Sequence, residues 1–128
     1  MEQLEKFFKS IKLIIIMGTE RRRSPRFILH QLIEIEFDRE TFIPVQGLDL
    51  SLHGVACKTQ LPLELYSRVY MLIQLNPNDE ESMLEAEGQV LRCDPMEEGL
   101  YRIGIEFRNL SASNIQKIKE WSSEREPI

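Results

Sequence analysis

Apolar and polar residues alternate along much of the chain between positions 28 and 107, as they do in half-buried β-strands. Strands are expected at 28–37, 41–48, 55–58, 68–75, 83–93 and 100–107, and the alternation is clear in 28–37, 68–75 and 83–93. Turn-forming residues separate most of them, and the segments show no βαβ rhythm. The pattern therefore predicts a mainly β fold, a small antiparallel barrel or sandwich of about six short strands.

Two features interrupt this alternation. Gln31 and Leu32 are out of phase with the other residues of 28–37. Pro44 lies inside 41–48 and has no backbone N–H to donate to a neighbouring strand. We therefore expect the second segment to lie at an edge of the sheet or to contain a bulge.

Apolar residues at helical spacing occur near the N-terminus, at Leu4, Phe7, Phe8, Ile11, Ile14 and Ile15. The apolar run 13–17 is far shorter than the ~20 residues that span a bilayer, and Glu2 and Glu5 do not suit a secretory signal. Three interpretations stay open: a helix that packs on protein, a helix that lies on a membrane surface, or a translation start at Met17. We favour packing on protein.

A second helix is expected near the C-terminus, over about 111–124. Ser111 is suited to cap its N-terminus, and Ile115, Ile118 and Trp121 form one apolar stripe. This stripe is expected to cover an open end of the barrel, with Trp121 as a core anchor. We accordingly divide the chain into an N-terminal helix or extension, residues 1–18, and a β domain with its C-terminal helix, residues 19–128.

Residues 49–54 connect two of the expected strands and read Asp-Leu-Ser-Leu-His-Gly. Gly54 is able to adopt a positive φ angle. The side chains of Asp49 and Ser51 are able to bond nearby backbone groups. One interpretation of this segment is a tight turn without a ligand, and the other is a binding loop.

The overall composition is that of a soluble globular domain, with 128 residues, 42% of them hydrophobic, and a formal net charge of -5. A pI near 5.1 argues against a general DNA- or RNA-binding protein. Against this acidic background, four of the six residues 21–26 are arginines. Pro25 disfavours a helix here. The segment is either a solvated basic loop or an extended arm that gathers guanidinium groups around an anion.

The remaining reactive side chains do not form a catalytic or metal-binding pattern. Cys57 and Cys93 lie in separate apolar segments, which favours free thiols in a reducing cytoplasm over a disulfide. His30 and His53 add no metal-ligand spacing. No nucleophile is paired with a base, so we expect neither an enzyme nor a bound metal or cofactor.

Two motifs point to one family when they are taken together. Arg22 and Arg26 form an Arg-x-x-x-Arg motif, and Asp49, Ser51 and Gly54 form an Asp-x-Ser-x-x-Gly motif about two strand lengths later. In this order and at this distance they resemble the PilZ domain, a family of bacterial receptors for the second messenger cyclic di-GMP. The resemblance implies that these five residues bind that nucleotide.

Two later segments extend the resemblance. Residues 89–92 read Gln-Val-Leu-Arg and look like the Val-x-Arg strand of the family. Residues 101–107 read Tyr-Arg-Ile-Gly-Ile-Glu-Phe and look like its closing strand. The match extends from about Glu20 to the C-terminal helix and implies the PilZ-like barrel.

The resemblance also implies a role for each motif. The guanidiniums of Arg22 and Arg26 would bond phosphate or the guanine O6/N7 edge, or would stack on the base. Asp49 and Ser51 would accept from guanine N–H groups or donate to phosphate oxygens. Gly54 would keep the turn free of a side chain.

Four more residues are candidates for the same site. Arg21 and Arg23 are placed to add phosphate contacts, although alternation in an extended arm would point them outward. His53 is able to stack on a base, but we expect it to be exposed to solvent. Arg92 either lies near the site or pairs with surface carboxylates, and we favour the second interpretation.

Ligand binding is expected to order the arginine arm and thereby to reorient the N-terminal helix or to create a surface for a downstream protein. A homodimer through the N-terminal helix is a related expectation. One alternative is a PilZ-like adaptor that binds protein but not the dinucleotide. Another is an OB-fold-like binder of single strands, which the glutamates on the strands and the clustering of arginines in one arm disfavour.

Overall fold

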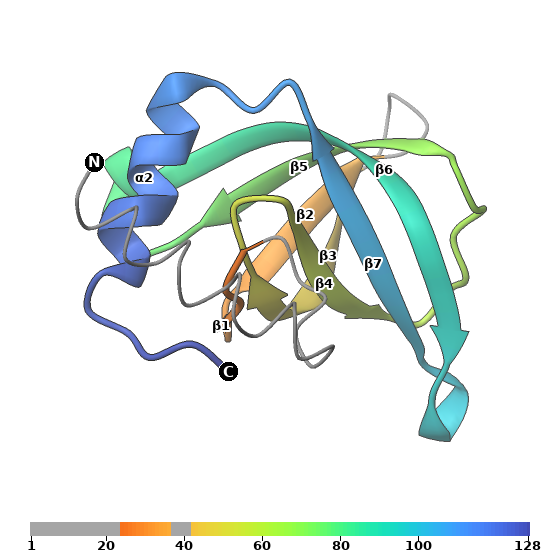
Figure 1. The fold of residues 1–128 in the computed structure, drawn as a ribbon. Coiled ribbons are helices and arrows are strands. Elements are labelled where there is room, and N and C mark those ends of the chain that lie inside the picture. The colour runs from red at the N-terminus through yellow and green to blue at the C-terminus, as the bar shows by residue number, and fades with distance from the viewer. Residues whose placement is uncertain (1–23, 37–41) are drawn as a thin grey trace, which may run out of the picture.

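The computed structural model describes residues 24–36 and 42–128, in which seven antiparallel strands and one α-helix are present (Figure 1). The strands are β1 (Phe27–Ile28), β2 (Leu32–Glu36), β3 (Phe42–Leu50), β4 (Gly54–Thr59), β5 (Arg68–Gln74), β6 (Met83–Pro95) and β7 (Tyr101–Arg108). The short 3₁₀ turns η1 (Glu80–Ser82) and η2 (Glu97–Gly99) precede β6 and β7, and helix α2 (Ala112–Ser122) follows β7. The strand order is β1-β3-β2-β5-β6-β7-β4, and an added β3–β4 pairing closes every strand except β1 into a barrel.

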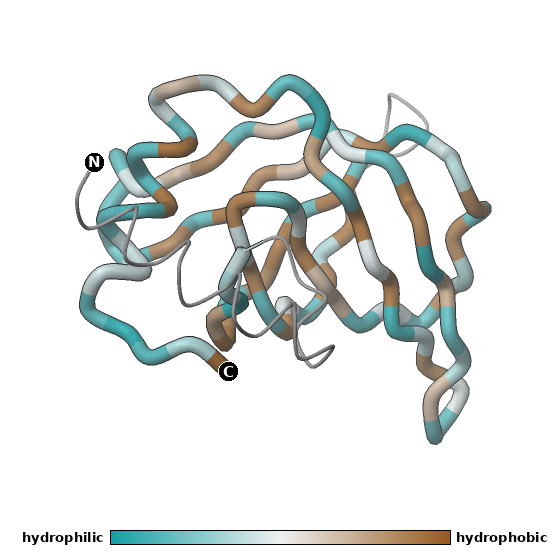
Figure 2. Tube along the Cα trace, viewed as in Figure 1, coloured by the Kyte–Doolittle hydropathy of each residue, from teal (hydrophilic) through white to brown (hydrophobic). Residues whose placement is uncertain are grey.

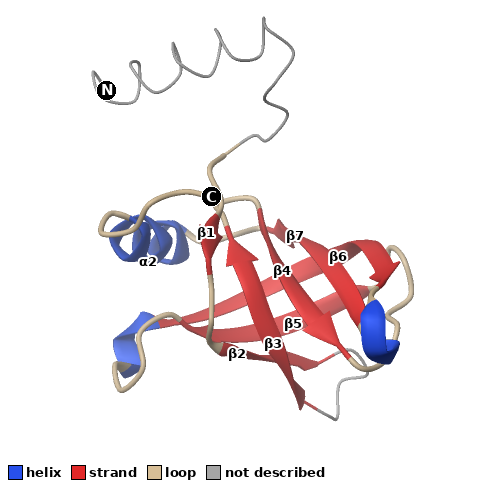
Figure 3. Ribbon diagram, turned by 90° about the horizontal axis from the view of Figure 1, so that it is seen from below, coloured by secondary structure: helices blue, strands red, loops and turns tan. Residues whose placement is uncertain are grey.

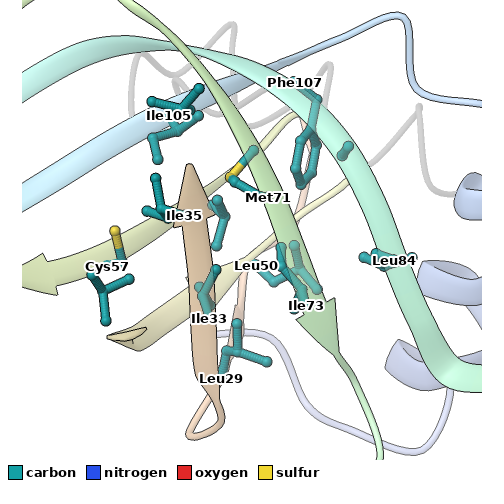
Figure 4. Packing of buried hydrophobic residues seen from close by; sticks show 14 of the residues in the cluster. Leu29, Ile33, Ile35, Leu50, Cys57, Met71, Ile73, Leu84, Ile105 and Phe107 are labelled. Atoms are coloured by element: carbon teal, nitrogen blue, oxygen red, sulfur yellow. The ribbon is translucent and has the colours of Figure 1, made fainter. Parts of the chain in front are cut away.

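The interior of the barrel contains the apolar phase of each strand, as the alternation predicts. On β7, Ile103, Ile105 and Phe107 are buried, whereas the residues between them lie on the outer face. The same alternation along the strands is visible in Figure 2. Ile33 on β2 and Ile73 on β5 are fully buried and are cross-strand partners (Figure 4). The prediction of a mainly β antiparallel barrel is confirmed.

The segment 28–37 is not one strand, so this part of the prediction is wrong. β1 pairs with the end of β3 and β2 pairs with its start, with a break over residues 29–31. Within the break, the backbone oxygen of Gln31 accepts from the Gly47 N–H at 3.0 Å, and its side-chain amide donates to the Leu75 oxygen at 2.7 Å. These bonds explain why Gln31 is out of phase.

Pro44 lies where its missing N–H does no harm. It is exposed on β3 opposite Glu34 of β2, beyond Gln46, where the pairing of β3 with β4 ends. A register shift between Gly47 and Asp49 also places a bulge in this strand. The expected edge and the expected bulge are therefore both present in β3.

Helix α2 covers the end of the barrel near β1, at the opposite end from η2 (Figure 3). The Ser111 hydroxyl caps it by accepting from the Asn114 N–H at 3.0 Å. Ile118 and Trp121 are buried as expected, but Ile115 is only half-buried. Asn114 is buried in its place, and its amide donates to the backbone oxygen of Glu85 on β6 at 2.8 Å.

Both cysteines are free thiols, with Cys57 buried on β4 and Cys93 half-buried on β6. Burial raises the pKa of the Cys57 thiol to about 12, an effect that the positive charge of Arg102 partly opposes. Since the thiolate is the reactive form, Cys57 is chemically inert at neutral pH. Its role is packing.

Residues 1–23 and 37–41 lie outside the described residues. The expected N-terminal helix over 1–18, the translation start at Met17 and the positions of Arg21, Arg22 and Arg23 therefore stay predictions. No helix within 24–36 and 42–128 is long and apolar enough to cross a membrane.

Candidate functional site

A pocket of about 340 Å³ lies on the outer face of the barrel, over β4, β6 and β7. The residues just before β1 and the turn between β3 and β4 form its sides. Its lining comprises Ser24, Arg26, Asp49, Ser51, His53, Gly54, Val55, Ala56, Leu91, Arg92, Asp94, Arg102, Gly104, Ile105 and Glu106. Six of the nine residues predicted for the ligand site are among them: Arg26, Asp49, Ser51, His53, Gly54 and Arg92.

The floor of the pocket consists of small residues from neighbouring strands. Gly104 on β7 is the cross-strand partner of Ala56 on β4, and Gly54 on β4 is the partner of Glu106 on β7. Because alternate residues of a strand share a face, Arg102, Gly104 and Glu106 all face outward. The outer face at Gly104 and Ala56 carries no side chain larger than a methyl group. The Arg92 side chain lies beside this part of the floor, with its Cβ 3.3 Å from where a Cβ at Gly104 would be.

Hydrogen bonds from Ser51 shape the turn between β3 and β4. Its hydroxyl oxygen accepts from the backbone N–H of His53 at 3.1 Å and from that of Gly54 at 3.3 Å. Its own N–H donates to the Gly54 oxygen at 2.9 Å. Ser51 is buried and bonds nearby backbone, as one interpretation of the sequence expected. The hydroxyl therefore holds the turn in the shape that borders the pocket.

Gly54 leaves its position free of a side chain, and the structure gives the physical reason. It does not use the positive φ that glycine allows, since Gly99 is the one glycine of the described chain with a positive φ. A Cβ atom at Gly54 would lie 2.2 Å from the backbone oxygen of Ile105 on β7. The close approach of β4 to β7 explains the glycine.

His53 is half-buried, so the expectation that it is exposed to solvent is wrong. Its Nδ1 lies 2.8 Å from the hydroxyl of Ser24, which is buried. Its backbone oxygen accepts from the Phe107 N–H at 2.9 Å. Through the bond to Ser24, the arginine-rich segment is joined directly to the turn between β3 and β4.

Arg26 is the member of the Arg-x-x-x-Arg motif that the structure describes, and it lines the pocket. It directly precedes β1, whose Ile28 is the cross-strand partner of Asp49. The short β1 therefore brings the arginine motif next to the acidic one. The backbone oxygen of Arg26 also accepts from the N–H of Ile128 at 2.8 Å, so the chain terminus lies beside it.

Among the described residues, three ion pairs involve side chains that line the pocket, and one of them joins Glu106 to Arg108 at 3.1 Å. Arg92 on β6 pairs with Asp94 at 2.9 Å, and Arg102 on β7 pairs with Asp49 at 3.0 Å. For Arg92, both expectations hold, because it lines the pocket and pairs with a surface carboxylate. Asp49 is nearly buried, with 9% of its side chain exposed.

Sequence reasoning did not assign Arg102, Gly104, Asp94 or Glu106 to the site. A usable signal was present in the predicted strand 100–107. Three of these residues fall in its polar phase, opposite to the isoleucines that enter the core. The outward face of this strand was therefore identifiable, although its position beside Asp49 was not.

Within the described ranges, no group of three or more His, Cys, Asp or Glu side chains is arranged to hold a metal ion. The pocket instead combines arginines with carboxylates that form ion pairs with arginines. Arginine binds phosphate and guanine edges through paired hydrogen bonds, and a carboxylate accepts from the N–H groups of a base. The arrangement suits an anionic nucleotide.

The family model described as "PilZ domain" matches residues 20–124. The chain belongs to the PilZ domain family. Solved structures of similar fold include the PilZ domain of YcgR from Escherichia coli with c-di-GMP, at 15% identity and a TM-score of 0.59, covering 82% of this chain and 97% of that one. No curated protein matches the sequence.

Two longer proteins share the PilZ fold with this chain. The Bacillus subtilis inhibitor of motility MotI/DgrA is 20% identical with a TM-score of 0.67, over 84% of this chain and 54% of that one. The Borreliella burgdorferi PlzA protein, solved in complex with c-di-GMP, is 15% identical with a TM-score of 0.58, over 85% of this chain and 44% of that one. This PilZ chain thus spans about half the length of these two relatives.

Proposed function

We propose that this PilZ protein is a receptor for cyclic di-GMP. The observation that carries the proposal is one pocket that is lined by both Arg26 and the Asp49–Gly54 turn. The resemblance of both segments to the family motifs supports it, as does the c-di-GMP present in two similar structures, those of YcgR and PlzA. These proteins are distant in sequence, so the proposal depends on the pocket of this chain.

The chemistry of the ligand fits the residues present. Cyclic di-GMP is a dianion with two guanines, and Arg22 and Arg26 are proposed to bond its phosphates or a guanine O6/N7 edge. Asp49 would accept from guanine N–H groups. A base lying over Gly104 would lie beside the Arg92 side chain, whose Cβ is 3.3 Å from where a Cβ at Gly104 would be and whose guanidinium pairs with Asp94 at 2.9 Å.

The other predicted site residues have supporting roles in this proposal. Ser51 and Gly54 maintain the turn, by hydrogen bonding and by allowing close approach to β7. His53 holds Ser24 beside the pocket. Arg21 and Arg23 would add phosphate contacts. Catalysis plays no part in the proposed function.

Isothermal titration calorimetry of the purified protein with cyclic di-GMP, and with GTP in parallel, tests this function. We expect saturable binding of the dinucleotide and none of GTP, and the stoichiometry will distinguish one bound dinucleotide from two. If neither calorimetry nor equilibrium dialysis detects binding, the receptor proposal is wrong. The adaptor interpretation would then be favoured.

We further propose that ligand binding is transmitted to the C-terminal helix and that the altered surface binds a downstream protein. Phe27 follows Arg26 and meets the Trp121 ring edge-on, with ring centroids 6.2 Å apart and planes at 78°. Arg125 lies over the same ring, 4.4 Å from its centroid. A movement of Arg26 on binding would therefore act on α2 through Phe27.

Trp121 is the one tryptophan in the chain, so its fluorescence reports on this contact. We expect saturating cyclic di-GMP to change the emission intensity, since side chains packed on the indole are displaced. The Arg26→Ala variant at the same nucleotide concentration controls for absorption by guanine. Unchanged emission in a protein that calorimetry shows to be saturated would contradict this transmission.

The homodimer through residues 1–18 and the cytoplasmic location stay predictions. The dimer concerns residues outside the described ranges.

A further inference from the structure

The Asp49–Arg102 ion pair has a geometry that bears on which base the pocket accepts. Asp49 is 6% exposed as a residue, and its Oδ2 accepts from the Arg102 guanidinium at 3.0 Å. A carboxylate this deeply buried is unfavourable unless a cation pairs with it. Within the described part of the chain, Arg102 provides that cation.

The pairing is selective. The direct cross-strand partner of Arg102 on β6 is Asp94, but Arg102 does not pair with it. Asp94 pairs instead with Arg92 of its own strand, at 2.9 Å. Arg102 reaches over β4 to Asp49 on β3, where only 9% of the carboxylate side chain is exposed, compared with 47% for Asp94. The better buried carboxylate gains more from the charge, which accounts for the choice.

This pair fixes the carboxylate in the absence of a ligand. A guanidinium bonds a carboxylate oxygen directionally, so the bond from Arg102 to Oδ2 restrains the Asp49 carboxylate before binding. The Watson–Crick edge of guanine presents two donors, N1–H and the 2-amino group, which a correctly oriented carboxylate accepts together. A free carboxylate would have to lose rotational freedom on binding, whereas a positioned one has already lost it.

We propose that Arg102 is a positioning residue that orients Asp49 to read guanine and so sets the base preference of the pocket. This inference depends on the proposed cyclic di-GMP function. Arg102 acts through Asp49. Replacing Arg102 is therefore expected to reduce the preference for guanine, whereas the loss of one positive charge alone would weaken the binding of every dinucleotide.

The test compares cyclic di-GMP with its inosine analogue, cyclic di-IMP, which lacks the 2-amino group. Calorimetry is performed on the wild type, Arg102→Met, Asp49→Asn and the double variant. The wild type is expected to prefer the guanine form by about 10-fold, as for a paired base contact. Arg102→Met should reduce this preference to about 3-fold or less, and the double variant should resemble Asp49→Asn, because the two residues act as a unit.

Arg68→Met is the matched control. Arg68 lies on β5 outside the pocket, and 75% of its side chain is exposed beside Glu87. The Arg68→Met variant should retain the wild-type preference for the guanine form. If thermal denaturation shows that Arg102→Met is unfolded, Arg102→Lys replaces it. Lysine keeps the positive charge but lacks the planar guanidinium that bonds a carboxylate directionally.

The outcomes separate the two proposals. If the wild type binds neither dinucleotide, the receptor function and this inference both fail. If the wild type binds and Arg102→Met weakens both dinucleotides equally, Arg102 is only structural or a phosphate contact, and the inference alone is overturned. A wild type without preference for the guanine form overturns it as well.

Discussion

Arg26→Ala is expected to weaken the binding of cyclic di-GMP by about 100-fold. Arg26 lines the pocket, and among the described residues no carboxylate forms an ion pair with it, whereas Arg92 and Arg102 are paired with aspartates. Its guanidinium is thus available to an anion. Two hydrogen bonds to a charged group, each contributing about 1.5 kcal/mol, correspond to this factor.

Calorimetry of three variants checks this expectation. Arg26→Lys should fall between wild type and Arg26→Ala, because lysine keeps the charge but loses the paired geometry. Arg68→Ala removes an exposed arginine on β5, and its affinity should stay within about 2-fold of wild type, since a distant exposed charge is screened by salt. If Arg26→Ala binds as tightly as Arg68→Ala, Arg26 is not part of the site. Arg22→Ala is expected to behave like Arg26→Ala.

The barrel was predictable because alternation determines which side of a strand is buried. The three strands 68–75, 83–93 and 100–107 agree with β5, β6 and β7 to within two residues at each end. The break at Gln31 was visible as an irregularity, but its cause was not. It depends on hydrogen bonds to Gly47 and Leu75, which are distant along the chain.

The sequence predicted one site for the two motifs, and Arg26 lines the same pocket as the Asp49–Gly54 turn, but the surroundings of these residues could not be predicted. Local sequence predicts that Ser51 shapes a turn, and it does so. Arg102 becomes a neighbour of Asp49 only because β4 lies between β3 and β7 in the closed barrel. Strand order is a property of the whole fold, so period-two patterns within single strands do not contain it.

The same limit explains why the sequence did not show what requires a glycine at position 54. From local sequence, a glycine at the end of a turn suggests a positive φ. The structure shows instead that the backbone of β7 passes close to this position, through the register in which Gly54 opposes Glu106. The reason for the glycine lies in a strand that begins almost fifty residues later.

Gly54→Ala is therefore expected to lower the free energy of unfolding by about 3 kcal/mol, at the upper end of overpacking effects. The added Cβ would lie 2.2 Å from the Ile105 backbone oxygen and 3.3 Å from the Glu106 Cα. Backbone atoms in a paired strand are unable to rotate away as a side chain would, so β4 and β7 must separate. Thermal denaturation should show a decrease of about 10 °C in Tm.

Gly104→Ala is the matched control, since it adds the same methyl group on the neighbouring strand. Its Cβ would lie 3.3 Å from the Cβ of Arg92 and farther from every other atom outside its own chain neighbours, so we expect a loss of only about 1 kcal/mol. Equal Tm values for the two variants would show that β4 and β7 are not as close at Gly54 as the structure places them. A large decrease for Gly54→Ala alone would establish that this motif glycine maintains the barrel beside the pocket, in addition to keeping the turn free of a side chain.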